Sequence, residues 1–207
     1  MHSILSLGLG YLIGCINPAA ILGKHYHVNL KEEGTGNLGA TNTLLVLGRK
    51  AGIFVALFDI FKSYFSARIA RILFPQLLVA GMIASLGAIL GHCFPITMHF
   101  DGGRGLASFG GMILAYNISM FLFILVTGWT MMVVFDAGVA ATVWGCIVFP
   151  LLVLWRDGIG SEFLLALAAS GLLIYMHTDK IRKAWELKGG DNVRQNLEEK
   201  VFRKKDR

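Results

Sequence analysis

The chain has 207 residues, a mass of 22.6 kDa and a formal net charge of +6, with 55% hydrophobic and 15% charged residues. A soluble domain carries about 25% charged residues, so this chain has too few polar groups to cover a globule. The composition excludes a disordered chain and, despite the positive charge, a nucleic-acid-binding protein. The three cysteines are scattered without CxxC spacing, which predicts neither a disulfide framework nor a zinc site.

Long uncharged stretches predict an all-α, polytopic membrane protein, because about 20 apolar residues cross the hydrocarbon core of a bilayer. A cleaved signal peptide is disfavoured, since no basic residue precedes the first apolar segment. The sequence predicts seven transmembrane helices. They are expected at about 3–23, 51–74, 77–93, 106–117, 119–135, 138–155 and 161–177.

The uncharged stretch 105–135 is the ambiguous one. As one helix it would be about 46 Å long, which exceeds a single span. Asn117 and Ser119 offer a turn in its middle. With two helices here, both the 24–50 segment and the tail, which has ten Lys or Arg residues, lie on the cytoplasmic side. We therefore expect the amino end outside and the carboxyl end in the cytoplasm.

Two regions follow from this reading: a seven-helix transmembrane domain over 1–177 and a basic cytoplasmic tail over 178–207. Val193, Leu197 and Val201 recur every four residues, which is typical of a helix lying on an anionic leaflet. A solvated charged tail that only aids topology is the alternative.

The first polar motif lies ahead of the second predicted helix. Gly34 and Gly36 allow backbone N–H groups to converge, and neutral donors and acceptors come from Thr35, Asn37, Thr41 and Asn42. Such a loop suits a small polyhydroxy or anionic ligand. An ordinary Gly/Asn-rich connector is the alternative.

The second motif is the glycine turn Gly102-Gly103-Arg104-Gly105, which opens a helix. We expect free backbone N–H groups, a positive helix terminus and the forked guanidinium of Arg104 to form a phosphate site there. Alternatively, Arg104 only marks the cytoplasmic side. His92 precedes this turn next to Cys93, but without ligand spacing no metal site is predicted.

Two further features carry charge or a titratable group. Asp59 and Lys62 are three residues apart within a predicted span, so we expect them to be buried and paired, either as a functional site or as a brace. His177 ends the last predicted helix, where it is an acid/base group or an interface marker.

In this order, the motifs GTGNLGATN, LGRKAG, DIFK, GHCFP with FDGGRGLASFGG, and the segment at His177 resemble the bacterial acyl-phosphate:glycerol-3-phosphate acyltransferase family, PlsY. The resemblance runs through most of the chain and implies seven helices with the amino end outside. It implies that the substrates are a fatty acyl phosphate and glycerol 3-phosphate, at the cytoplasmic face of a bacterial inner membrane. The products are 1-acylglycerol 3-phosphate and phosphate, and no cofactor, metal or nucleic acid takes part.

The resemblance also implies the roles of individual residues. The catalytic residues would be Thr35, Asn37, His177 and Lys180. The substrate- and phosphate-binding residues would be Gly34, Gly36, Asn42, Arg49, His92, Gly102, Gly103, Arg104 and Gly105. The Asp59–Lys62 pair would be structural.

The sequence departs from the family pattern at several of these positions. Thr35 replaces a serine and keeps the hydroxyl, and Arg104 replaces a lysine and keeps the charge. Leu45 and Asp136 stand where the family has arginines, and Lys180 stands where it has an asparagine that orients the substrate. Two alternatives to the acyltransferase therefore remain: a divergent paralogue with weak or altered acceptor activity, and a small-anion transporter that uses Asp59 and Lys62. The oligomeric state is not predicted.

Overall fold

The computed structural model describes residues 1–135 and 138–186, and within these ranges it contains helices and no strand. The side chains of residues 183–186 are outside this description. The helices are α1 His2–Gly14, α2 Pro18–His25, α3 Ala40–Leu47, α4 Arg49–Leu73, α5 Ala80–Cys93, the 3₁₀ turn Ile96–Met98, α6 Leu106–Tyr116, α7 Ile118–Val134, α8 Gly138–Asp157, α9 Ser161–Met176 and α10 Thr178–Glu186.

The single helix predicted over 3–23 is wrong, because the segment breaks between α1 and α2. Asn17 caps α2 by accepting a hydrogen bond from the backbone N–H of Ala20 at 3.0 Å, and Pro18 occupies the first helical position. An asparagine cap followed by proline starts a new helix, because proline has no backbone N–H to donate to a carbonyl of the preceding turn. The two pieces together remain long and apolar enough to cross a membrane.

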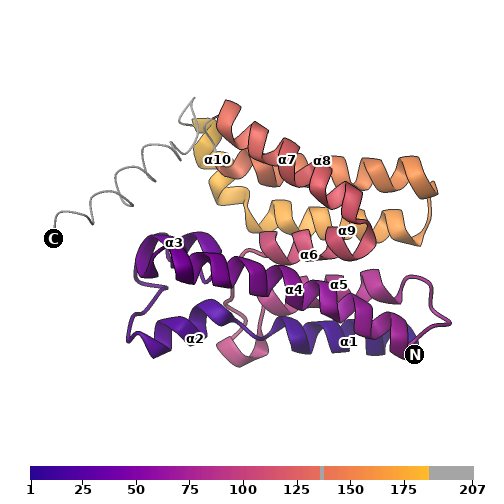
Figure 1. Cartoon of the computed structure of the whole chain (residues 1–207), viewed down its shortest axis with the longest axis horizontal. Helices are drawn as coiled ribbons and strands as arrows, with labels where there is room; N and C mark the ends of the chain where they lie inside the picture. Colours follow the sequence, from indigo (N-terminus) through magenta and orange to yellow (C-terminus); the bar gives the residue numbers. More distant parts are fainter. Residues whose placement is uncertain (136–137, 187–207) are drawn as a thin grey trace.

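The break at Asn117 is confirmed. Asn117 has an extended backbone and its side chain accepts from the N–H of Met120 at 3.0 Å, so that it ends α6 and caps α7. The chain reverses direction here (Figure 1). Short helix α3, which precedes α4, was not expected from the sequence.

Two groups of helices lie side by side with α6 between them, as Figure 1 shows: α1, α4 and α5 form one group, and α7, α8 and α9 the other. The closest approach is between α1 and α5. A Cβ added at Gly10 or Gly14 would overlap the backbone of Ala84 or Ala88, so only glycine permits this spacing. Around Phe109 and Phe149, whose rings meet edge to face, α6 packs against α8.

Among the residues that the structure describes, three segments are long and apolar enough to cross a membrane: His2–His25, Ala80–Met98 and Gly138–Asp157. Helices α6, α7 and α9 are apolar but shorter, and α4 carries several charges. Large hydrophobic side chains cover the outside of the bundle, among them Leu122, Trp129 and Leu151, which suits a lipid environment.

Candidate active site

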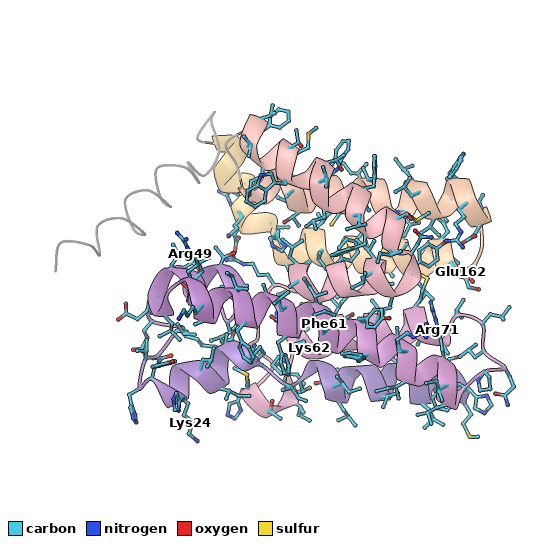
Figure 2. All side chains as sticks on the ribbon, viewed as in Figure 1. Lys24, Arg49, Phe61, Lys62, Arg71 and Glu162 are labelled. Atoms are coloured by element: carbon cyan, nitrogen blue, oxygen red, sulfur yellow. The ribbon has the colours of Figure 1, made fainter. Side chains whose placement is uncertain are left out.

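Two loops meet at one end of the bundle. Lys31 of the first loop forms an ion pair with Asp101, and a Cβ added at Gly103 would lie 2.7 Å from the carbonyl oxygen of Leu38. Figure 2 shows Lys24 and Arg49 at this end, whereas Arg71 and Glu162 lie at the opposite end. The two predicted motifs therefore lie together on one side, as the sequence predicted.

Asn42 holds the first loop in its shape. It is fully buried, its Nδ2 donates to the carbonyl of Leu30 at 2.7 Å, and its Oδ1 accepts from the backbone N–H of Thr35 at 2.6 Å. Gly34 has a φ of +62° and packs so closely on Asn42 that a Cβ there would overlap Oδ1. Because both polar atoms of Asn42 bond to the backbone, its buried side chain holds together the two ends of the loop at Leu30 and Thr35.

The loop presents its other polar groups outward. Thr35 is exposed, Asn37 is half-buried, and Gly36 adopts a φ of +69°, a left-handed conformation that favours glycine. Arg49 is exposed at the first residue of α4 (Figure 2). These residues lie on the same end of the molecule as the glycine turn.

The glycine turn corrects one expectation. The N–H groups of Gly102 and Gly103 are not free, because they donate to the carbonyls of Cys93 at 3.1 Å and His92 at 3.0 Å. These bonds satisfy the last carbonyls of α5, which a helix end leaves unpaired. Gly105, with a φ of +83°, begins α6 without a side-chain cap. The first-turn N–H groups of α6 have no partner within their own helix, and the guanidinium of Arg104 belongs to the same turn.

His92 differs from its predicted place in the anion site, because it belongs to a buried charged cluster. Its Nδ1 lies 2.9 Å from Nζ of Lys62 and 3.3 Å from Oδ1 of Asp59. Lys62 and Asp59 are 2.8 Å apart, and all three side chains are at most 5% exposed. The predicted burial and pairing of Asp59 and Lys62 are confirmed, and His92 is the partner that the sequence did not reveal.

Lys62 also reaches the break in the first membrane segment. Its ammonium donates to the carbonyls of Gly14 at 3.1 Å and Ile16 at 2.9 Å. These carbonyls lie at the end of α1 and in the break before α2, where the helix leaves them unpaired. Lys62 therefore ties the first segment to α4.

His177 follows the last residue of α9. It is buried, and its Nδ1 lies 2.9 Å from the carbonyl oxygen of Leu173. A carbonyl only accepts, so Nδ1 carries the proton and Nε2 of the neutral ring is left as an acceptor. Burial lowers the pKa of His177, and the charges of Arg104 and Lys180 lower it further, whereas the bond to Leu173 acts in the opposite direction.

The same residues show that α9 ends beside the glycine turn. A Cβ at Gly105 would lie 3.7 Å from the side chain of Leu173, one turn before His177. The electrostatic effect of Arg104 on His177 reflects the same proximity. The glycine turn and the end of α9 therefore lie side by side, and the meeting of Arg104, His177 and Lys180 in one pocket stays a prediction. Direct contact of Thr35, Gly36 or Asn37 with the turn stays a prediction.

A cavity of about 560 Å³ lies under the first loop, lined in part by Lys24, His27 and Lys31. The sequence predicts Lys24 and Lys31 only as cytoplasmic charges and His27 only as a surface residue, and none of the predicted site residues lines this cavity. The available signal was the run of four basic residues within positions 24–31, namely Lys24, His25, His27 and Lys31. Among the described residues, no group of three His, Cys, Asp or Glu side chains converges as a metal site would require.

Comparison with known proteins places the chain in a family. The family model described as glycerol-3-phosphate acyltransferase matches residues 4–187. A glycerol-3-phosphate acyltransferase of Thermoanaerobacter pseudethanolicus is 32% identical over 186 residues, covering 88% of this chain and 92% of the relative. One of Macrococcus caseolyticus is 42% identical over 136 residues, covering 64% of this chain and 68% of the relative.

Two crystal structures of PlsY (YgiH), an integral membrane glycerol 3-phosphate acyltransferase, are similar to the whole fold. The glycerol 3-phosphate form is 27% identical with a TM-score of 0.82, over 91% of this chain and 94% of that one. The lysophosphatidic acid form is 26% identical with the same TM-score, over 95% of this chain and 99% of that one.

Proposed function

The chain belongs to the glycerol-3-phosphate acyltransferase family, and from this premise we propose that it transfers a fatty acyl group from an acyl phosphate to the C1 hydroxyl of glycerol 3-phosphate. The products are 1-acylglycerol 3-phosphate, which enters phospholipid synthesis, and phosphate. The observation that carries the proposal is that the glycine turn lies beside both the first loop and the end of α9, which His177 follows.

No acyl-enzyme intermediate is required, because an acyl phosphate is a mixed anhydride with a good leaving group. The C1 oxygen of the acceptor bonds to the acyl carbon, the bond from that carbon to the phosphate oxygen breaks, and the hydroxyl proton is removed. Nε2 of His177 is the acceptor for this proton, because Nδ1 is bonded to Leu173 and the lowered pKa keeps the ring neutral at pH 7. Arg104 and the first-turn N–H groups of α6 hold phosphate oxygens.

The first loop completes the site in this proposal. Thr35 and Asn37 supply neutral hydrogen bonds to the acceptor or to the developing oxyanion, and Arg49 adds a cation at the entrance. Asn42, Gly34 and Gly36 shape the loop. Lys180 contributes charge close to His177, where it strengthens anion binding at the expense of orienting a hydroxyl.

The protein is a bacterial membrane protein, and we place its active site at the cytoplasmic face. In the proposed topology α1 and α2 form the first of seven spans, followed by α4, α5, α6, α7, α8 and α9. The end that carries Lys24, Arg49 and α10 faces the cytoplasm, and the amino end lies at the opposite side (Figures 1 and 2). Positive charges favour the cytoplasmic side, which supports this orientation.

The proposed domain organisation is a transmembrane domain over 1–177 and a basic tail over 178–207. Helix α10 forms the start of this tail. The remainder, including the predicted face of Val193, Leu197 and Val201, lies outside the described residues.

The two alternatives fare differently. The transporter depended on Asp59 and Lys62 as functional intramembrane charges, and their engagement with His92 and with backbone carbonyls removes that support. The paralogue with altered acceptor activity keeps specific support from Lys180 beside His177 and from half-buried Leu45 in α3.

Phosphate release by the purified protein in detergent tests the proposal. With an acyl phosphate, release should depend on glycerol 3-phosphate and be matched by 1-acylglycerol 3-phosphate. A panel of other polyol phosphates distinguishes the paralogue, which would release phosphate with another acceptor. Absence of acyl-phosphate-dependent release with every acceptor would overturn the proposal, and solute flux into liposomes without acyl phosphate would favour the transporter.

A further inference from the structure

The cluster of Asp59, Lys62 and His92 lies at the centre of the helix bundle, and one edge of the cluster contacts the glycine turn. Figure 2 shows Lys62 in the middle region of the bundle. A Cβ added at Gly103 would overlap Nε2 of His92, so that edge of the ring packs directly against the turn. The opposite edge, Nδ1, faces Lys62 and Asp59. One imidazole thus spans the distance between the buried ion pair and the turn that carries Arg104.

His92 holds the turn through its backbone as well. Its carbonyl accepts from the N–H of Gly103 at 3.0 Å, so the ring and the main chain of one residue contact the same glycine. Arg104 follows Gly103 directly. A shift of the His92 ring would therefore displace the residue that we propose holds phosphate.

The partners of Lys62 fix how His92 presents its ring. Nδ1 of His92 lies within hydrogen-bond distance of Nζ of Lys62 and 3.3 Å from Oδ1 of Asp59, so the ion pair holds this edge of the ring while the Nε2 edge packs on Gly103. Asp59 balances the charge of Lys62, and the carbonyls of Gly14 and Ile16 use further protons of the ammonium.

We infer that Lys62 and Asp59 are positioning residues of the anion site, which act through His92 to set the place of the Gly103–Arg104 turn. This inference rests on the proposed function and deepens it, since a brace for the bundle would need neither His92 nor the contact with Gly103. The cluster contacts the break in the first segment, α4, α5 and the glycine turn. The position of the phosphate site therefore depends on contacts at the centre of the membrane domain.

The test compares variants that separate charge balance from positioning. Removing one charge of a buried pair leaves the other uncompensated, whereas removing both is often tolerated. Asp59→Asn and Lys62→Met alone should therefore lower the thermal midpoint, and the double variant Asp59→Asn/Lys62→Met should regain most of it. The double variant should still have a KM for acyl phosphate raised about tenfold or more, because the turn is displaced. Loss of folded enzyme lowers the apparent kcat and does not raise KM.

A second pair of variants keeps the test decisive if the double variant does not fold. His92→Gln reaches toward Gly103 with its amide, whereas His92→Asn can only replace the edge that faces Lys62. The KM should rise more for His92→Asn than for His92→Gln. Ser85→Ala, which removes a buried hydroxyl that bonds to the Ser63 carbonyl at 3.2 Å, is the matched control and should leave KM unchanged.

Nitrogen NMR supplies an independent readout, in which the ring resonances of His92 should shift in the Lys62→Met variant and stay in place in Ser85→Ala. A wild-type KM in the double variant and in His92→Asn, or unchanged ring resonances of His92 in Lys62→Met, would overturn the inference. Failure of the proposed function is distinguishable, because the wild-type protein itself would then release no phosphate.

Discussion

The ring of His177 is hydrogen-bonded through Nδ1 to the carbonyl oxygen of Leu173, 2.9 Å away and one turn earlier in α9. This bond leaves Nε2 unprotonated in the neutral ring and aims the basic nitrogen away from its own helix. The bonding of a histidine to its own helix is thus what makes it available as a base in the proposed mechanism.

Replacing this base should slow turnover. His177→Asn should lower kcat by about 100-fold or more, the usual contribution of a general base. Because the pKa of His177 is lowered from its ordinary value of 6.5, wild-type kcat should be level above pH 6.5 and fall only as the pH drops through the lowered pKa. Phosphate release measured across pH checks both results. His25→Asn, in an exposed residue at the end of α2, is the control. An acid limb that persists unchanged in His177→Asn would assign the titration to another group.

Arg104 should be required for its charge and its shape. Arg104→Ala should lower acyl-phosphate-dependent turnover by at least about 100-fold, because a preorganised cation on the phosphate is lost. Arg104→Lys, which keeps the charge without the forked geometry, should retain part of it. Arg68→Ala, an exposed arginine near the other end of the bundle, serves as the control for phosphate release. Normal turnover by Arg104→Ala would show that Arg104 only marks topology.

Lys180→Asn should leave turnover equal or raise it. An amide orients a hydroxyl better than an ammonium does, whereas the lysine strengthens anion binding. We therefore expect kcat to hold or increase while KM for the phosphate-bearing substrates rises. Initial rates over a range of glycerol 3-phosphate concentrations separate the two. A large fall in kcat would mean that Lys180 has its own role in this chain.

Asn42→Ala should loosen the first loop. It leaves the N–H of Thr35 and the carbonyl of Leu30 without their partner, at a cost of about 1–3 kcal/mol. We expect a lower thermal midpoint together with a higher KM for glycerol 3-phosphate. Glu33→Ala, in an exposed side chain of the same loop, should change neither. Equal behaviour of the two variants would remove the positioning role of Asn42.

The topology can be tested with single cysteines. Cys15, Cys93 and Cys146 are buried, so their background labelling should be low. Ser119→Cys, exposed at the start of α7, should react with an impermeant maleimide from outside the cell, and Glu33→Cys in the first loop only after permeabilisation. Labelling of both from the same side would contradict the seven-span arrangement.

Much of the fold could be predicted from local rules. The length of the 105–135 stretch and the turn at Asn117 led to two helices, because the limit that a bilayer sets on a span is independent of tertiary contacts. The Asn17–Pro18 break is equally visible in the sequence, but the uncharged run across it favours one continuous helix. Short α3 carries too few residues for a periodic pattern to emerge.

The candidate site was predictable as a set of motifs and less so as geometry. The sequence brought the first loop and the glycine turn to one end, because both flank helices that begin there. It could not show that the N–H groups of Gly102 and Gly103 donate hydrogen bonds to the end of α5, nor that His92 contacts Lys62. Both features depend on tertiary contacts that no local pattern encodes.

The contacts of Lys62 also bear on how the protein is made. A helix with Asp59 and Lys62 near its middle partitions poorly into lipid by itself. Gly14 and Ile16, which accept from the ammonium, are synthesised earlier, so α4 meets two of its partners as it leaves the ribosome, whereas His92 arrives only with α5. The carbonyls of the first segment can therefore solvate the Lys62 ammonium in place of water, and insertion of α4 becomes more favourable once the first segment is in the membrane.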